Sequence, residues 1–237
     1  MAETTRSSAL GTAVMGGVIG AVLTAAVLVF AMPQFLGSRI VRQGMLADPQ
    51  ILVDASDALR DKQNAPTIAA ARAALETPFG SSWKGAARPQ VVLVEFFDYA
   101  CPYCKASNPH VDQLLKENPG LRVVYRELPI LGQDSVEAAR LSLAASKAGR
   151  FREFHDALYA AGRPAPDTNA TAARVANIPP TPVQDPAADA ELKRNFEMAG
   201  RLGATGTPLF VIGDRVLNGA VGYDALKQAV EAAQKKS

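Results

Sequence analysis

The chain has 237 residues, of which 48% are hydrophobic and 20% are charged, and its formal net charge is +2. This length can hold one membrane segment, one well-packed domain and some accessory structure. A net charge so close to zero gives no electrostatic reason to expect a nucleic acid or an acidic partner, and neither is predicted. The chain has two cysteines, Cys101 and Cys104, so a structural disulfide could not form without using one of them.

The N-terminal part of the chain contains a long hydrophobic segment. Residues 1–8 form a short tail, and residues 9–33 carry no charged side chain. At about 1.5 Å per helical residue, this segment is long enough to cross a hydrocarbon core of roughly 30 Å. It is also longer than the apolar region of a signal peptide, which has about 7–15 residues. We therefore expect residues 9–33 to be an uncleaved transmembrane anchor, with a cleaved signal peptide as the alternative.

Residues 34–76 are expected to form a helical stalk. Asp48 and Pro49 suit the cap and the first position of one short amphipathic helix, and Pro66 suits the start of a second. The apolar stripe on each helix is too thin to form a core by itself. The segment therefore either packs against the following domain or mediates homo-oligomerisation through residues 40–76.

A proline- and glycine-rich stretch at residues 77–89 is expected to be a linker, and residues 90–237 a single domain. Within this domain the hydrophobic pattern alternates between strand and helix periodicity. The expected elements are a strand at 90–97, a helix at 102–117, a strand at 121–128, a helical insert at about 131–200, a strand that begins at Pro208, a strand at 215–217 and a helix at 223–235. This order, β-α-β, a helical insert and then β-β-α, predicts an α/β fold.

The two cysteines follow the first strand, at the point where the helix at 102–117 begins. Attack on a disulfide requires a thiolate, and the unpaired N–H groups and dipole of a helix start favour negative charge at Cys101. Cys104, one turn further along, can attack the mixed disulfide that forms and release the product. Between them, the fixed φ angle of Pro102 suits the first helical turn, and Tyr103 supplies a neutral phenol. The spacing therefore predicts thiol–disulfide redox chemistry.

A proline in front of a later strand supports this interpretation. Pro208 follows Thr207 and precedes an apolar run, and proline suits the first position of a strand. We expect a cis bond here, because such a bond next to the cysteines leaves the backbone of Thr207 free to pair with an extended substrate peptide. The alternative is a trans proline at the end of a loop.

Together these motifs resemble those of the DsbA-like thioredoxin-fold family of thiol–disulfide oxidoreductases. Three segments carry the resemblance: Val-Glu-Phe-Phe-Asp-Tyr-Ala-Cys-Pro-Tyr-Cys at 94–104, Phe-Arg-Glu-Phe-His-Asp-Ala-Leu at 151–158 and Gly-Thr-Pro-Leu-Phe-Val-Ile at 206–212. The resemblance implies a thioredoxin fold with a helical domain inserted after the second strand. It also implies that Cys101 attacks, that Cys104 resolves and that Pro208 is the cis-proline.

The same resemblance gives a role to Glu95, which lies six residues before Cys101. It matches a buried family glutamate that assists proton transfer, whereas the alternative is a strand acid paired with Arg126 or with a lysine. Cys-Pro-Tyr-Cys differs from the Cys-Pro-His-Cys of the strongest oxidants, and Thr207 before the proline is closer to the disulfide isomerases. The helical extension resembles the suppressor-of-copper-sensitivity C branch, and the anchor resembles membrane-bound DsbA-like proteins.

We predict an enzyme, a thiol–disulfide oxidoreductase that acts as a dithiol oxidase on cysteine-containing secreted or periplasmic proteins. It would be anchored in a bacterial inner membrane with its catalytic domain in the periplasm, where a membrane or periplasmic redox partner reoxidises it. No cofactor and no resident metal are predicted. One alternative is an oligomeric disulfide isomerase or reductase that uses residues 40–76, and another is a thiol protein that holds Cu(I) in copper tolerance. A zinc site would need both cysteines with His110 and His155, and it is disfavoured because the histidines have no paired spacing.

Overall fold

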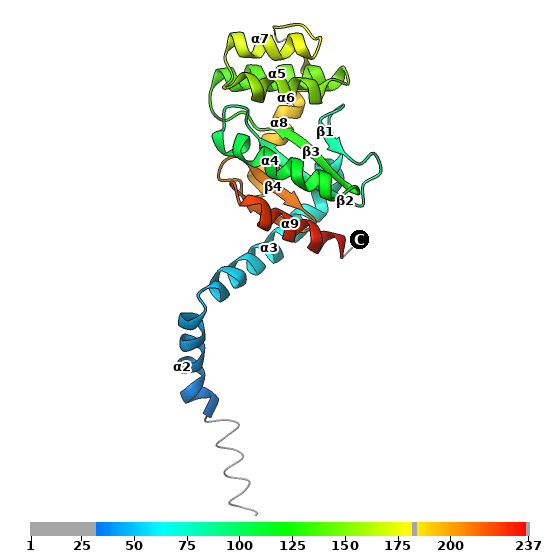
Figure 1. Cartoon of the computed structure of the whole chain (residues 1–237). Coiled ribbons are helices and arrows are strands. Elements are labelled where there is room, and N and C mark those ends of the chain that lie inside the picture. The colour runs from blue at the N-terminus through cyan, green and yellow to red at the C-terminus, as the bar shows by residue number, and fades with distance from the viewer. Residues whose placement is uncertain (1–31, 182–183, 236–237) are drawn as a thin grey trace, which may run out of the picture. The chain divides into compact units, whose positions relative to one another are not determined.

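The computed structural model describes residues 32–181 and 184–235 of the chain (Figure 1). The chain separates into two compact units, residues 1–58 and residues 59–237. The N-terminal tail and nearly all of the expected anchor at 9–33 lie outside the described residues. Among the helices that the structure describes, none combines the length and the apolar character needed to cross a membrane.

The first unit is helical in its described part. Helix α2 (Met32–Ala47) is followed by helix α3 (Gln50–Glu76), which continues into the second unit. The Oδ1 atom of Asp48 accepts a hydrogen bond of 3.1 Å from the N–H of Gln50, so Asp48 caps α3 as predicted. Pro66 lies inside α3 and does not open a second helix, so that boundary was wrong. The helix continues past Pro66 because its later turns pack into the core, and this packing offsets the lost hydrogen bond.

The second unit is built on a five-stranded sheet with the order β1-β3-β2-β4-β5. The strands are β1 (Trp83–Gly85), β2 (Val91–Phe97), β3 (Leu121–Glu127), β4 (Leu209–Ile212) and β5 (Arg215–Asn218). Strands β2 and β3 are parallel, and the other neighbouring pairs are antiparallel. Strand β1 lies inside the expected linker at 77–89, where it extends the sheet by pairing with β3. Three residues are too few to show a strand periodicity, which is why the sequence pattern did not reveal β1.

Helices cover both faces of this sheet (Figure 1). The core on one face contains α4 (Pro102–Glu117) and α9 (Gly222–Gln234), and the core on the other face contains the last turns of α3. Between β3 and β4 the chain forms α5 (Gln133–Lys147), α6 (Phe151–Ala161), α7 (Pro166–Val175) and α8 (Pro186–Arg201). The predicted order, β-α-β, a helical insert and then β-β-α, is therefore found, and β2 is buried on both faces as its nearly continuous apolar run indicated.

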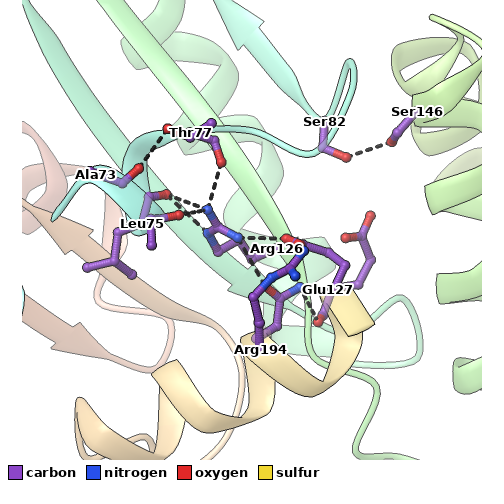
Figure 2. Close-up of polar contacts among 11 residues, drawn as sticks. Ala73, Leu75, Thr77, Ser82, Arg126, Glu127, Ser146 and Arg194 are labelled. Carbon is purple, nitrogen blue, oxygen red and sulfur yellow. Dashed lines mark hydrogen bonds and ion pairs between the residues drawn. The ribbon is translucent and has the colours of Figure 1, made fainter. Parts of the chain in front are cut away.

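A buried arginine joins α3 to the rest of the second unit (Figure 2). The guanidinium of Arg126 donates to the carbonyl oxygens of Leu75, at 2.9 and 3.0 Å, of Thr77, at 2.8 Å, and of Ala74. The last carbonyl groups of a helix lack partners within the helix, so Arg126 caps α3 at its C-terminal end. It also donates to Glu191 on α8 at 2.8 Å. The last turns of α3 are thus an integral part of the second unit.

Candidate active site

The two thiols lie at the start of α4, just beyond the end of β2. Cys101 is the N-cap residue of α4, and Pro102 takes the first helical position, as predicted. Both cysteines are present as thiols. Cys101 is 4% exposed and Cys104 is completely buried. Because they are three positions apart, they share one face of the first helical turn, with Cys104 on the inner side.

The loop before β4 completes this site. Strand β4 runs antiparallel to β2, and Leu209 pairs with Phe96. This register brings the residues just before β4 close to the end of β2, and therefore close to Cys101. The bond between Thr207 and Pro208 is cis, as expected. The carbonyl oxygen of Thr207 accepts a hydrogen bond of 3.2 Å from the Cys101 thiol.

The carboxylate of Asp98 organises the turn between β2 and α4. Its Oδ1 atom accepts hydrogen bonds from the N–H of Ala100, at 2.8 Å, and from the hydroxyl of Ser135. Its Oδ2 atom accepts from the N–H groups of Ile130, at 2.8 Å, and Leu131, at 2.9 Å. These bonds tie the active-site turn to the segment that leads into α5. The sequence interpretation missed Asp98, although an aspartate that can bond the N–H two residues further on is a recognisable turn signal.

Exposed apolar side chains lie on the first turn of α4 and on the segment that Asp98 ties to the active-site turn. Tyr103 is 63% exposed on the first turn of α4, and Pro102 beside it is also exposed. Ile130 and Leu131, which Asp98 holds next to the same turn, are exposed as well. The surface near Cys101 therefore offers apolar contacts to an incoming polypeptide.

Glu95 lies behind the thiols, in the middle of β2. Its register partners, Tyr125 on β3 and Phe210 on β4, belong to the core that contains Cys104, so Glu95 points to the same side of the sheet. Neither carboxyl oxygen has a hydrogen-bond partner among residues 32–181 and 184–235. Burial raises the pKa of Glu95 to about 8, and the charge of Lys84 partly offsets this effect. Glu95 is therefore mostly protonated at neutral pH.

Arg126 is not the partner of Glu95, because its guanidinium pairs with Glu191 and points into the opposite side of the sheet. The sequence alternative of an ion pair between Glu95 and Arg126 is therefore wrong. Lys84, on β1, acts on Glu95 through its charge, while its ammonium group is 2.6 Å from Asp156 on α6. The pairing of β1 with β3 brings Lys84 to this side of the sheet, and no sequence pattern indicated that these two strands pair.

The inner thiol differs in its acidity from an exposed cysteine. Burial raises the pKa of Cys104 well above its usual range, and the nearby Glu95 carboxyl raises it further. Cys104 therefore keeps its proton at neutral pH, and any reaction in which it becomes a thiolate requires a nearby group that exchanges a proton with it. Glu95 lies on the correct side of the sheet for this exchange.

The two histidines do not join the cysteines. His155, on α6, is enclosed by aromatic rings, and His110 lies further along α4. Within the part of the chain that the structure describes, His, Cys, Asp and Glu side chains do not gather into a group of three that could hold a metal. The arrangement of these side chains therefore gives the zinc alternative no support.

Comparison with known proteins identifies the family. The family described as DSBA-like thioredoxin domain matches residues 92–231, which is more than half of the chain. The chain belongs to the DsbA-like thioredoxin family. Its membership confirms the predicted family and the thioredoxin-like α/β fold, and it supports the predicted enzyme class of DsbA-like thiol–disulfide oxidoreductases.

Solved structures of proteins similar to this DsbA-like chain agree with that assignment. Proteus mirabilis ScsC in a transitional conformation is 30% identical with a TM-score of 0.67, and the match covers 86% of this chain and 96% of that one. A periplasmic thioredoxin-like protein from Salmonella enterica serovar Typhimurium is 32% identical with a TM-score of 0.63, over 69% and 95% of the two chains. The Na(+)/H(+) antiporter NhaA 3 of Salinispora tropica is 32% identical over 162 residues, which are 63% of this chain but only 24% of that protein's length. The likeness to ScsC supports the predicted suppressor-of-copper-sensitivity C-like branch.

Proposed function

We propose that this DsbA-like protein exchanges disulfides with cysteine-containing proteins through Cys101 and Cys104 and works as a dithiol oxidase. The different surroundings of the two thiols carry the proposal. The Cys101 thiol lies at the outer end of α4, 3.2 Å from the carbonyl oxygen of Thr207. The Cys104 thiol is completely buried on the same side of the sheet as Glu95. An outer thiol that meets the substrate and an inner thiol that exchanges a proton suit the two halves of disulfide exchange.

The reaction starts from the Cys101–Cys104 disulfide. A substrate thiolate attacks the Cys101 sulfur, the bond between the two enzyme sulfurs breaks, and its electron pair leaves on Cys104. Glu95, which is mostly protonated at neutral pH, supplies the proton that Cys104 takes up. The second substrate thiolate then attacks the substrate sulfur of the mixed disulfide, so that the substrate gains a disulfide and Cys101 leaves as a thiolate. The two electrons remain on the enzyme dithiol until a redox partner removes them.

We propose that the substrate binds across the exposed surface next to Cys101. Pro102 and Tyr103 offer apolar contacts there, and Thr207 offers its backbone beside the reacting sulfur. Contacts of this kind suit an extended, cysteine-containing polypeptide. Tyr103 adds no positive charge near Cys101, so we expect a reduction potential between about −120 mV, typical of a strong oxidant, and about −180 mV, typical of an isomerase.

A second candidate function is disulfide isomerisation by an oligomer. The observation that favours it lies in the first unit, where apolar side chains on α2 and the start of α3 are exposed to solvent. These side chains are Ile40, Val41, Leu46, Ile51, Leu52 and Val53. Solvent-exposed apolar residues in such numbers mark an interaction surface. An isomerase would use the reduced pair, with Cys101 attacking incorrect disulfides.

We also propose that the chain works outside the cytoplasm, in the periplasm of a bacterium, because a protein dithiol oxidase requires an oxidising compartment. The proposed anchor at residues 9–33 would hold it at the inner membrane. Fractionation of cells that express the full-length chain tests both points. Recovery of the chain with soluble cytoplasmic proteins would contradict them.

The central experiment uses the oxidised full-length chain and a reduced peptide that contains two cysteines. We expect the peptide to gain a disulfide while the enzyme becomes a dithiol, and equilibration with glutathione then gives the reduction potential. A potential near about −270 mV, typical of a reductant, would contradict the oxidase. Rearrangement of a scrambled multi-disulfide protein without net oxidation would favour the isomerase, and retention of stoichiometric Cu(I) with negligible exchange would favour a copper-binding protein.

A further inference from the structure

The helical insert directs two polar side chains into the core behind Cys104. His155 and Tyr159 lie one turn apart on α6, and their ring centroids are 4.9 Å apart. His155 is 2% exposed and Tyr159 is 8% exposed. Neither ring nitrogen of His155, nor the hydroxyl of Tyr159, has a hydrogen-bond partner within the described ranges of the chain. Buried polar groups without a partner are rare in folded proteins, so two of them on one helical turn require an explanation.

Aromatic rings form a box around His155. Five ring centroids lie 4.8–5.7 Å from the centroid of the imidazole. These rings belong to Phe97, Tyr99, Tyr125, Phe151 and Tyr159. The box adjoins Glu95, because Tyr125 is the register partner of Glu95 and Phe97 lies two residues further along the same face of β2. Three side chains with buried, unpartnered polar atoms, Glu95, His155 and Tyr159, therefore line one region of the core.

Titratable and charged groups face this region from every strand and helix that packs around it. They are Lys84 on β1, Glu95 on β2, Tyr125 and Glu127 on β3, Cys104 and Asp112 on α4, and Asp156 on α6, together with Tyr99 in the turn before α4. Burial, followed by the charge of Cys104, raises the pKa of Tyr159, so the phenol keeps its proton. Burial, followed by the charge of Lys84, lowers the pKa of His155, so the imidazole is neutral. Each of these two groups can therefore both donate and accept a hydrogen bond.

We propose that His155 and Tyr159 are positioning residues of the redox centre, which hold the proton that Glu95 and Cys104 exchange. This inference rests on the proposed function and deepens it. When a substrate thiolate attacks the Cys101 sulfur, a new disulfide forms between them, and the electron pair of the broken enzyme disulfide leaves on Cys104. The Tyr159 hydroxyl donates a hydrogen bond to this developing thiolate. His155, whose nitrogens have no partner in the described part of the dithiol form, then forms a hydrogen bond to the Glu95 carboxyl while the Glu95 proton passes to the Cys104 sulfur.

A charged pair at the surface of α6 lies next to this region in the chain. Asp156 directly follows His155, and its half-exposed carboxylate pairs with Lys84 at 2.6 Å. The charge of Lys84 also acts on Glu95 and on His155, so this ion pair influences the buried region electrostatically from the side of β1 and α6. In this way the helical insert takes part in the chemistry as well as in the fold.

The experiment compares full-length variants of α6 in one assay. Tyr159→Phe and His155→Phe remove the polar atoms, and His155→Gln keeps a donor and an acceptor but cannot titrate. Phe154→Leu is the matched control, because Phe154 is a buried side chain of the same helix and core that has no polar atom. The oxidised chains react with a fluorescent single-cysteine peptide, and the rate of mixed-disulfide formation at Cys101 is measured from pH 5 to pH 9.

We expect Tyr159→Phe and His155→Phe each to slow this step about tenfold near pH 7, the effect of losing one hydrogen bond to a developing charge. His155→Gln should recover most of the rate with a flatter pH profile, and Phe154→Leu should keep the wild-type rate and profile. Thermal unfolding of all four variants separates folding defects from chemistry. Equal effects of Tyr159→Phe and Phe154→Leu, or no effect of Tyr159→Phe, would overturn the inference.

A second measurement does not depend on the proposed function. The ionisation of Glu95 is followed by the carboxyl carbon signal of isotopically labelled protein in the dithiol form. Loss of a polar neighbour should move the apparent pKa of Glu95 by about 0.5 unit or more in His155→Phe, and Phe154→Leu should leave it in place. If the wild-type chain forms no mixed disulfide at all, the proposed function fails, and this titration still decides whether α6 controls the proton on Glu95.

Discussion

The Cys101 thiol donates a hydrogen bond to the carbonyl oxygen of Thr207 across 3.2 Å, which joins residues 106 positions apart in the sequence. The contact exists because β4 pairs antiparallel with β2, so that the loop before β4 meets the turn after β2. It keeps the outer thiol, which is 4% exposed, beside the backbone of Thr207, whereas the inner thiol is completely buried. The two cysteines should therefore behave differently when each is replaced.

We expect Cys104→Ser to trap a mixed disulfide at Cys101, and Cys101→Ser to form none. Cys104 keeps its proton at neutral pH because burial raises its pKa, and it lies too deep for a substrate to reach. Incubation with a disulfide-bonded peptide, followed by intact-mass measurement without reductant, checks this. Adduct formation by Cys101→Ser at a rate comparable to that of Cys104→Ser would contradict the assignment of roles.

Glu95→Gln should stabilise the dithiol protein, and increasingly so as the pH rises. Burial raises the pKa of Glu95 from 4.5 to about 8. The folded chain thus holds a proton that the unfolded chain releases above pH 4.5. The contribution of this carboxyl to stability is therefore complete below pH 4.5 and is lost as the pH rises through about 8. Glutamine does not titrate, so Glu95→Gln should not lose stability in this way. The difference in unfolding free energy between this variant and the wild type should therefore grow by roughly 3–5 kcal/mol over this range.

Urea unfolding of the wild type and Glu95→Gln at several pH values measures this difference. Glu197→Gln, at an exposed position on α8, is the control and should show no such trend. The same Glu95 variant should exchange disulfides more slowly, because Cys104 loses its proton donor. An unfolding free-energy difference that stays constant from pH 4.5 to pH 8 would mean that Glu95 is not buried as a protonated acid.

Arg126→Met should loosen the packing of the last turns of α3 against the rest of the second unit. The guanidinium satisfies carbonyl oxygens of the last turn of α3 and pairs with Glu191, both in the interior (Figure 2). Without the guanidinium, the helix-end carbonyl oxygens lose their donor and the buried Glu191 keeps only its pair with the exposed Arg194, so we expect a loss of about 3–5 kcal/mol in unfolding free energy. Hydrogen exchange should accelerate in residues 66–77. Arg140→Ala, which breaks an exposed ion pair with Asp189, should lose less than about 1 kcal/mol.

Sequence patterns predicted the elements whose signals lie in neighbouring residues. The apolar run at 91–97 predicted a strand buried on both faces, and β2 is buried along nearly all of its length. Cys101 and Pro102 predicted the start of a helix, since proline suits its first position, and α4 begins there. The spacing of the two thiols relative to one another follows from these two elements alone.

What the sequence did not reveal depends on contacts between distant segments. Asp98 matters through its bonds to Ile130 and Leu131, and no local pattern connects those positions. Lys84 faces Glu95 because a three-residue strand pairs with β3, a register that no periodicity encodes. Pro66 signalled a helix start, and tertiary packing overrode that preference.

Asp98→Ala should loosen the active-site turn and slow disulfide exchange. The carboxylate accepts bonds from the N–H groups of Ala100, Ile130 and Leu131, which would be left without this acceptor. Hydrogen bonds to charged groups contribute about 1.5–3 kcal/mol each, so we expect a loss of at least about 3 kcal/mol in unfolding free energy. Asp98→Asn keeps one acceptor oxygen and should lose less. Thermal unfolding and peptide exchange rates check this order, and equal values for the two variants would contradict it.

The paired substitution Ile51→Ser and Leu52→Ser in the full-length chain should separate the oxidase from the isomerase. Both side chains are exposed on α3 within the first unit. This design is cleaner than deletion of residues 40–76, because Ile68 and Leu75 belong to the core of the second unit and the deletion would unfold it.

If residues 40–58 hold an oligomer together, light scattering should show its loss in the variant. A monomeric oxidase would keep its rate of peptide oxidation within about twofold, since the site at Cys101 is untouched. An isomerase that depends on the oligomer would lose about tenfold or more of its activity on a scrambled protein, an apparent 1.4 kcal/mol or more. Unchanged mass and unchanged isomerisation would exclude these side chains as an oligomer interface.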